Sequence, residues 1–287
     1  MLALALKVQP MDLPPSHEII VSYPDRSNKM QLYRVNDDGC ARRRITDCSQ
    51  DCSMPAWSPD GKKIVYVQQS SNGNSLWLSD PDGKNPRMLV RSGINMEPSW
   101  LPDSKNIVWF DLIPGRSPVE SSFKLYILNT ETLQSRPLFT DPEQVKFGNL
   151  MPAVSPDGTK VAFVSNRSGQ FRIWLSNLDG SRARPISPPA ADLDETLQLP
   201  IEQKAPSWSP DGQWIAHWEG VETDHLSGST GRADPQRDAL IEASWNVWIV
   251  GRDERTNTRR GMAMIRSGRP MASSVDRFRT RPKVAQM

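Results

Sequence analysis

Short apolar runs recur along this chain, and turn residues bound each of them. One complete set begins with the apolar stretch 55–58, continues after a turn with KIVYV at 63–67 and SLWLS at 75–79, and ends at 87–90. Runs of four to eight β-branched and aromatic residues between Pro, Gly and Asp are typical of β-strands. We therefore expect four short antiparallel strands in this part of the chain.

The same order of strands and turns is repeated elsewhere in the chain. The N-terminal copy lacks a recognisable first strand, so its first strand corresponds to the second strand of the other copies. The paired strands of the further copies are EIIVSY at 18–23 with QLYRV at 31–35, NIVWF at 106–110 with KLYIL at 124–128, VAFVS at 161–165 with RIWLS at 172–176, and WIAHW at 214–218 with NVWIV at 246–250.

A heptapeptide marks the start of four of these copies: PAWSPDG at 55–61, PSWLPDS at 98–104, PAVSPDG at 152–158 and PSWSPDG at 206–212. In this motif Pro presets φ for the first corner of a turn, Asp caps the turn, and Gly supplies a positive φ. Successive first prolines are 43, 54 and 54 residues apart. This spacing is typical of propeller blades with inserted loops rather than of helical solenoids. The motif residues are Pro55, Trp57, Asp60 and Gly61; Pro98, Trp100 and Asp103; Pro152, Asp157 and Gly158; and Pro206, Trp208, Asp211 and Gly212.

The repeats predict an all-β fold, a β-propeller of four-stranded antiparallel blades. About five blades are readable, the first lacks its first strand, and the ring is expected to be incomplete or open at its C-terminal end. We predict an N-terminal extension at 1–16, the propeller at 17–252 and a basic, disordered tail at 253–287.

These motifs resemble the WD-like repeat of the TolB family, whose blades carry PxWSPDGxxIAF followed by IYxMDxDG and RRLT. The resemblance covers residues 18 to about 252, with Val154 in place of one Trp and with Leu101 and Ser104 as departures in the third copy. It implies that the Trp packs between blades and that Pro-Asp-Gly makes the turn. Trp57, Trp100 and Trp208 are accordingly expected in the core rather than in a ligand cage.

The loops of the predicted blades are unequal. In a four-stranded meander the first and third turns share one face, and the second turn shares the other face with the links between blades. The tight turns all fall on the first face. The long segments 111–123, 141–150, 188–204 and 219–244 all fall on the second. A partner is expected at this long-loop face or at the channel mouth that it surrounds, because scaffolded loops commonly carry binding sites. The alternative is that these loops are tolerated insertions.

The tail differs in composition from the rest of the chain. Residues 253–287 hold nine basic and three acidic residues and none of the ten tryptophans, whereas the remainder holds 26 basic and 30 acidic residues. A basic arm suggests nucleic-acid binding, but a frameshift explains more. In a shifted frame, each new codon takes the last base of one codon and the first two bases of the next. Whatever synonymous codons are used, Met262/Ala263 and Met271/Ala272 must then encode Gly, and Met264/Ile265 must encode Asp. Synonymous codons then permit GDDPVWSPDGK. We hypothesise a frameshift between about Arg252 and Gly261, and we expect no nucleic-acid partner.

Cysteine and histidine positions offer little catalytic chemistry. Cys40, Cys48 and Cys52 lie within thirteen residues, which suggests a local disulfide between Cys48 and Cys52, a thiolate metal site, or incidental cysteines in a polar loop. A zinc site needs a fourth ligand, and His17, His217 and His225 are all distant in sequence. His217 lies in a predicted strand and is expected to be a satisfied structural histidine, while His225 lies in a long loop.

The sequence shows no enzyme motif: it has no GxSxG, no HExxH and no phosphate-binding glycine loop. The acidic turns with Asp80 and Asp82, and with Asn177 and Asp179, offer too few ligands for calcium and are explained by turn formation. No metal or other cofactor is expected. No apolar run reaches the roughly 20 residues of a membrane span, and MLALALKV at 1–8 lacks the basic start and cleavage site of a signal peptide.

The leading functional prediction is a non-catalytic scaffold that binds a protein or peptide through its long-loop face. The family resemblance implies an extracytoplasmic bacterial setting and association with the cell envelope. One alternative is the gating propeller of a prolyl oligopeptidase-type serine hydrolase without its catalytic domain. Another is the extracellular sensor domain of a membrane receptor.

Overall fold

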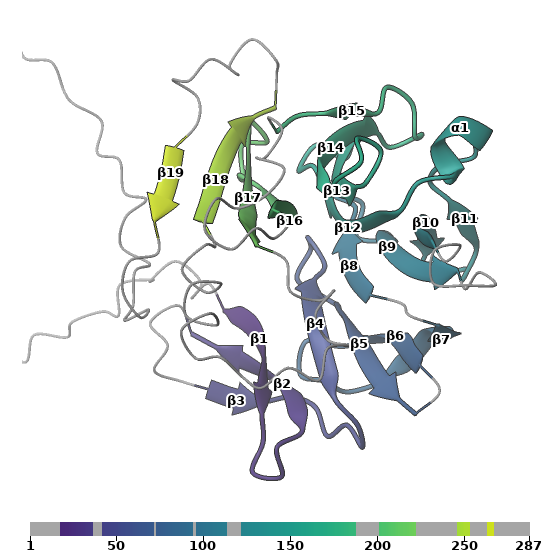
Figure 1. The fold of residues 1–287 in the computed structure, drawn as a ribbon. Coiled ribbons are helices and arrows are strands. Elements are labelled where there is room, and N and C mark those ends of the chain that lie inside the picture. Colours follow the sequence, from purple (N-terminus) through teal and green to yellow (C-terminus); the bar gives the residue numbers. More distant parts are fainter. Residues whose placement is uncertain are drawn as a thin grey trace, which may run out of the picture.

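The computed structural model describes residues 18–36, 42–71, 73–93, 96–113, 122–187, 201–221, 246–252 and 263–266. These residues form five antiparallel sheets that stand around a common centre (Figure 1). We number the sheets blade 1 to blade 5 in chain order. The arrangement confirms the predicted β-propeller.

Blade 1 has three strands, and each later blade has four. Blade 1 contains β1 (Ile19–Pro24), β2 (Met30–Val35) and β3 (Arg42–Arg44), in that order. Blade 2 contains β4 (Cys52–Trp57), β5 (Ile64–Ser70), β6 (Gly73–Ser79) and β7 (Arg87–Gly93). These three strands correspond to the second, third and fourth strands of the later blades, as predicted, and the residues before position 18 lie outside the described part of the chain.

Blades 3, 4 and 5 repeat this order. Blade 3 contains β8 (Met96–Trp100), β9 (Asn106–Ile113), β10 (Ser122–Asn129) and β11 (Ser135–Pro137); blade 4 contains β12 (Asn149–Val154), β13 (Lys160–Ser165), β14 (Arg172–Asn177) and β15 (Arg184–Pro185); blade 5 contains β16 (Ile201–Trp208), β17 (Trp214–Val221), β18 (Asn246–Gly251) and β19 (Ala263–Arg266). A single-turn helix, α1 (Pro142–Val145), lies between blades 3 and 4. Asp141 caps it by accepting a hydrogen bond from the backbone N of Glu143 at 2.8 Å.

Strand β19 lies within the range predicted to be a disordered tail. It pairs with β18 from Ile249↔Ala263 to Asn246↔Arg266 and supplies the fourth strand of blade 5. The outer edge of β18 offers unpaired backbone groups, and an adjacent extended segment satisfies them. The rest of 253–287 lies outside the described residues, so the frameshift hypothesis stays a prediction.

The hydrophobic core formed by the described residues consists of four clusters, and each cluster joins two neighbouring blades. Alternate residues of one strand belong to different clusters: Val65 and Val67 of β5 face blade 3, whereas Ile64 and Tyr66 face blade 1. A strand buried on both faces needs apolar residues at successive positions, not at alternate ones. This explains why the middle strands are continuous apolar runs. No cluster among the described residues joins blade 5 to blade 1.

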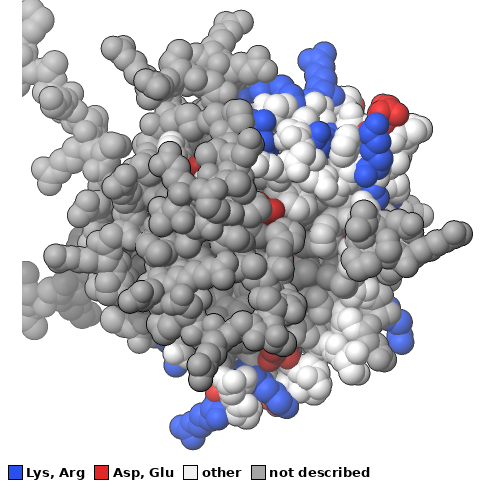
Figure 2. All heavy atoms as spheres, viewed as in Figure 1, with Lys and Arg blue, Asp and Glu red and all other residues white. Residues whose placement is uncertain are grey.

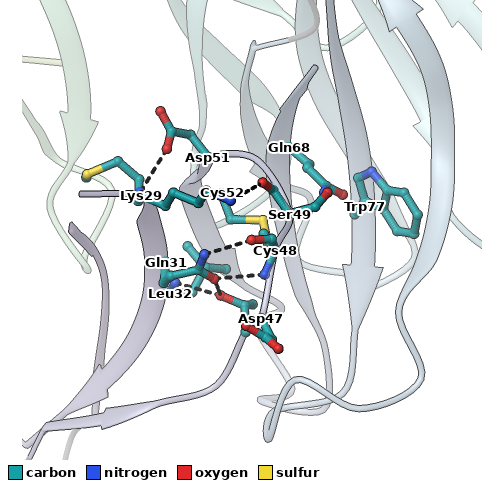
Figure 3. Close-up of a disulfide and its surroundings, with 12 residues drawn as sticks. Lys29, Gln31, Leu32, Asp47, Cys48, Ser49, Asp51, Cys52, Gln68 and Trp77 are labelled. Atoms are coloured by element: carbon teal, nitrogen blue, oxygen red, sulfur yellow. Dashed lines mark hydrogen bonds between the residues drawn. A yellow bond between two sulfur atoms is a disulfide. The ribbon is translucent and has the colours of Figure 1, made fainter. Parts of the chain in front are cut away.

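A disulfide stabilises the link between blades 1 and 2 (Figure 3). Cys48 and Cys52 are bonded, and Cys52 is fully buried. The buried Gln31 of β2 holds this link, because its side-chain amide donates to the carbonyl O of Cys48 at 3.0 Å and accepts from the backbone N of Cys48 at 2.9 Å. Of the three interpretations of these cysteines, the disulfide between Cys48 and Cys52 is confirmed. Cys40 lies outside the described residues.

Candidate binding channel

The first strands of blades 2 to 5 line the centre of the molecule, and all four carry the same irregularity. Register shifts interrupt the pairing of β4, β8, β12 and β16 with their neighbours at equivalent positions. At each shift the residue before the motif proline has a positive φ; these residues are Met54 (50°), Glu97 (49°), Met151 (52°) and Ala205 (50°). A bulge of this kind bends the strand and redirects its side chains.

These bulges surround a cavity of about 540 Å³. Its described lining comes from all four inner strands and consists mainly of motif prolines, Met54, Met151 and Trp208. A second cavity of about 450 Å³ shares Pro98, Ser99, Val154 and Pro156 with the first and extends along the tight turns past Trp57 and Trp100. We call the two together the channel. It is large enough for an extended peptide segment or a small organic molecule.

Glu97 is the only ionisable residue among the described residues that line the larger cavity. Burial raises the pKa of its carboxyl to about 7, although the positive charge of Lys204 in β16 acts in the opposite direction. Lys204 is itself paired with the buried Glu202, with its Nζ 3.9 Å from Oε2. Among the described lining residues, the channel therefore presents one ionisable side chain, a carboxyl group with a pKa near neutral pH, beside mainly apolar side chains.

The motif tryptophans pack between blades and also border the channel. The indole Nε1 of Trp100 donates to the carbonyl O of Ala56 at 3.0 Å, and that of Trp208 donates to the carbonyl O of Ala153 at 2.9 Å. Each bond links one blade to the inner strand of the blade before it. Trp57 is half-buried against blade 1, and its Nε1 has no hydrogen-bond partner among the described residues.

The motif aspartates stabilise turns and do not point to a ligand. Asp60, Asp157 and Asp211 each accept from the hydroxyl of the Ser two residues earlier and from the backbone N two residues later. In the third copy Leu101 is buried in the core, Ser104 takes the positive φ of 55°, and Asp103 accepts from the backbone N of Lys105 and of Asn106. The turn thus forms with Leu101 and Ser104 in place of the usual Ser and Gly of the motif. The motif glycines Gly61, Gly158 and Gly212 each have a positive φ, as the motif predicts.

Other residues singled out in the sequence are placed as follows. His217 is buried as expected, and its Nδ1 lies 3.3 Å from the carbonyl O of Trp218, whereas its Nε2 has no partner in the described part of the chain; only one of its two ring nitrogens is therefore satisfied. His225 lies outside the described residues. Asp80, after β6, accepts from Lys63 Nζ before β5 at 2.7 Å, and Asp82 accepts from the backbone N of Lys84 within its own turn. Across residues 18–266 as far as they are described, no group of three or more His, Cys, Asp or Glu is placed to hold a metal ion.

Arg167, at the start of the β13–β14 turn, is a further residue that sequence reasoning missed. Its guanidinium lies over the rings of Phe139 (4.5 Å), Phe163 (5.2 Å) and Trp174 (5.4 Å) and donates to Asn149 Oδ1 at 3.0 Å. Burial lowers its pKa to about 10. Cation–π contacts of this kind stabilise a desolvated charge. Arg167 therefore connects blade 4 with Phe139, which follows the last strand of blade 3.

The predicted long loops are only partly described. Parts of these segments belong to β9, β10, α1, β12, β16 and β17, and positions 114–121, 188–200 and 222–245 lie outside the described residues. In the view of Figure 2, the Lys and Arg side chains of the described residues stand mainly at the outer rim. The helix α1 is too short to cross a membrane, and no other helix is described.

Residues 68–219 match the family model described as the TolB beta propeller domain. The chain belongs to the TolB β-propeller family. This TolB-family chain is 30% identical over 146 residues to the Tol-Pal system protein TolB of Nitratidesulfovibrio vulgaris, which covers 50% of the chain and 30% of that protein. It is also 26% identical over 241 residues to dipeptidyl-peptidase 5 of Porphyromonas endodontalis, covering 71% of the chain and 34% of that protein.

The structure of a putative TolB from Agrobacterium tumefaciens shares the fold. Its TM-score is 0.60 at 21% identity, over 86% of this chain and 80% of that chain. The TolB-family chain spans about a third of the length of the curated relatives that it matches. The repeat pattern thus identified the family correctly, while the channel carboxyl, Glu97, escaped notice because nothing in its local sequence marks it.

Proposed function

We propose that this chain is a non-catalytic binding propeller whose channel receives an extended segment of a protein or peptide partner. The observation that carries the proposal is the channel itself: four inner strands contribute a wall of prolines, methionines and one tryptophan around the single carboxyl of Glu97. A wall of mainly apolar side chains with a single ionisable group among the described residues is typical of a binding site, because the apolar side chains supply affinity and the polar group orients the ligand.

The charge of the channel favours a basic residue in the bound segment. Glu97 is the only ionisable lining residue that the structure describes in the larger cavity, and its Lys204 neighbour already has Glu202 as a partner. A cationic side chain that enters this cavity loses water, and Glu97 offsets that loss by ionising. A lysine or arginine flanked by apolar residues is the segment that best matches this wall.

An extracytoplasmic setting, in the periplasm or at the cell surface, is part of the proposal. The Cys48–Cys52 disulfide supports it, because disulfides persist in oxidising compartments. The relationship to the Tol-Pal system protein TolB supports it as well. The proposal extends to a partner associated with the cell envelope, as the resemblance to the TolB family implies.

A library of unstructured peptides, screened by fluorescence polarisation, tests the proposed site. We expect enrichment of peptides with one basic residue among apolar residues. Glu97→Gln is expected to weaken the selected peptides about tenfold, which corresponds to about 1.4 kcal/mol. Glu131→Gln is the matched control, because Glu131 is an exposed glutamate at an outer turn of the same blade; it is expected to leave affinity unchanged.

The pH dependence of binding adds a second readout. The pKa of Glu97 is raised to about 7, so affinity for a basic peptide is expected to rise between pH 6 and pH 8 in the parent and to stay flat in the Glu97→Gln variant. Lys204 is the charged group that acts on Glu97 from β16. Selected peptides without basic residues, or equal binding by both variants, would contradict the proposed site.

A second candidate function is the propeller of a serine peptidase. The match to dipeptidyl-peptidase 5 over 71% of the chain favours it. The nucleotide sequence that surrounds the coding region distinguishes the two proposals. A reading frame for an α/β-hydrolase domain after the propeller would favour the peptidase, whereas further blade motifs followed by a stop codon would favour the binding propeller.

A further inference from the structure

A separate cavity lies between blade 2 and the chain that links blades 1 and 2. It has a volume of about 300 Å³ and shares no described lining residue with the channel. Strands β5, β6 and β7 form one side, and residues 49–50 of the link form the other. We call this cavity the link pocket. The side chains that give it its chemical character are those of Gln50, Gln68, Gln69, Ser75, Trp77 and Arg91.

The strand register explains why these side chains meet. Tyr66 of β5, which packs in the cluster beside blade 1, pairs with Trp77 of β6, and Gln68 pairs with Ser75. Paired residues share one face of a sheet, and so do alternate residues of one strand. Gln68, Ser75 and Trp77 therefore lie on the face of blade 2 that is turned toward blade 1. Figure 3 shows the side chain of Gln68 between Ser49 of the link and Trp77.

Trp77 offers a carbon surface to this pocket rather than a hydrogen-bond donor. Its Nε1 donates to Ser75 Oγ at 3.2 Å, and that hydroxyl donates to the carbonyl O of Gln68 at 3.3 Å. These two bonds fix the orientation of the indole. The ring packs on one side against the cluster of Ile64 and Tyr66, and Trp77 is half-exposed where it borders the pocket.

Three glutamines supply most of the polar lining. The side-chain amides of Gln50, Gln68 and Gln69 make no hydrogen bond within the part of the chain that the structure describes. Each amide has two N–H donors and one carbonyl acceptor. Arg91 is exposed, is the only ionisable side chain among the described lining residues, and adds further N–H donors. The pocket thus surrounds an aromatic surface with unused donors and acceptors.

The wall opposite blade 2 is held in place by bonds within the chain. The Cys48–Cys52 disulfide closes a short loop around Ser49 and Gln50. The backbone N of Gln69 in β5 donates to the carbonyl O of Asp51 at 2.8 Å and fastens this loop to blade 2. A wall that is ordered before binding lowers the entropic cost of taking up a ligand.

We propose that the link pocket binds a saccharide, with one sugar ring against Trp77 and its hydroxyl groups bonded to the glutamine amides and Arg91. A sugar ring has the same two-part character: C–H groups gather on its faces, and hydroxyl groups, each a donor and an acceptor, stand at its rim. An apolar ligand would leave the three amides without partners. A phosphate group would find one exposed cation only. The volume is at the lower end of the range for ligand pockets, which suits the end of a glycan chain.

A glycan array probed with the full chain, followed by saturation-transfer difference NMR of the strongest glycan, tests this site. We expect the C–H protons of one ring to receive most of the saturation, because they lie against the indole. Gln68→Leu keeps the bulk of a half-buried side chain but removes its amide, and it is expected to weaken binding about tenfold. Gln134→Leu is the matched control: this exposed glutamine between β10 and β11 lies outside both the link pocket and the channel, and its loss is expected to leave affinity unchanged.

Substitutions of Trp77 separate stacking from folding. Trp77→Phe keeps an aromatic ring and is expected to retain affinity within about threefold, whereas Trp77→Leu keeps apolar packing without the ring and is expected to lower affinity at least tenfold. Thermal unfolding of each variant verifies its fold. Gln69→Ala, at an exposed position, provides a variant that leaves the core untouched and is expected to weaken binding about threefold.

The glycan site is independent of the channel site, and Glu97→Gln distinguishes the two. This substitution is expected to leave glycan affinity unchanged, because Glu97 does not line the link pocket. Failure of the parent to bind any glycan on the array would overturn the inference. Equal affinity of the parent and of folded Trp77→Leu or Gln69→Ala would overturn it too, as would glycan binding that Glu97→Gln weakens, since the sugar would then occupy the channel.

Discussion

His217 is a buried base inside a blade. It lies in β17, is 1% exposed, and its Nδ1 is 3.3 Å from the carbonyl O of Trp218 while Nε2 has no partner in the described structure. Burial lowers its pKa from 6.5 to about 4. The sequence showed only a His between Ala and Trp in a strand, which predicted burial but not the missing partner. Hydrogen-bond partners of a central strand come from neighbouring strands, and a single strand does not reveal them.

The low pKa of His217 makes stability fall as pH decreases. Below pH 6.5 the unfolded state binds a proton that the folded state binds only near pH 4, so the free energy of unfolding falls between these values. We expect the loss to be on the order of 3 kcal/mol. Urea unfolding of the parent and of His217→Gln between pH 7.5 and pH 4.5 checks this.

The comparison with the variant is necessary because Glu97 acts in the opposite direction. Its raised pKa means that the folded state holds a proton that the unfolded state releases, so stability decreases as pH rises through this range. The difference between parent and His217→Gln removes the Glu97 contribution. Parallel pH profiles for the two proteins would show that His217 is not the responsible group.

At the scale of the element, the inner strands are more irregular than their sequence suggests. Each has a bulge at the residue before the motif proline, with φ between 49° and 52°. Met, Glu and Ala have no preference for this conformation, and a following proline favours extended backbone instead. The strain is therefore stored in the blade and offset by packing around the channel. A residue-by-residue reading predicts strand here and misses the bulge.

Ala205 allows a direct measurement of this strain. It is exposed and has φ 50°, so Ala205→Gly removes strain without loss of burial. We expect a gain of about 1 kcal/mol in the free energy of unfolding, measured by urea denaturation.

Ala153→Gly is the matched control for this gain. Ala153 is half-buried in β12 without a positive φ, so glycine there adds freedom to the unfolded chain and relieves no backbone strain. A loss of about 0.5–1 kcal/mol is expected. A loss at both positions would mean that the bulge carries no strain.

At the scale of the whole molecule, long-range polar contacts add to the core clusters that hold the blades together. Arg252 follows β18 in blade 5 and reaches blade 4, where its Nη1 donates to Asp157 Oδ2 at 2.8 Å and its Nη2 donates to Thr159 Oγ1 at 3.2 Å. Arg184 of blade 4 in turn donates to the carbonyl O of Arg252 at 3.1 Å. The described part of blade 5 has no core cluster with blade 1, so these contacts matter most for blade 5.

Arg252→Ala is expected to loosen blade 5. The loss of two charge-assisted or polar bonds at a partly exposed site is expected to lower the free energy of unfolding by about 1 kcal/mol. Limited proteolysis is expected to cut blade 5 before the other blades. Lys62→Ala removes an exposed cation beside Asp60 and is expected to have almost no effect. Equal protease sensitivity of the two variants would argue against this role for Arg252.

The sequence by itself determined the blades, their strand order and the family. Turns and strands that are buried on both faces are local features, and each of them recurs in a repeated pattern. It also indicated the Cys48–Cys52 bond, since only a few residues separate the two thiols. Only the tertiary structure decided which residues meet at the centre. Glu97 and Lys204 are far apart in the sequence. The Nε1 of Trp57 lacks a hydrogen-bond partner among the described residues, whereas those of Trp100 and Trp208 have one, and this difference is visible only in the structure. Such features depend on how blades pack against one another, which no local pattern encodes.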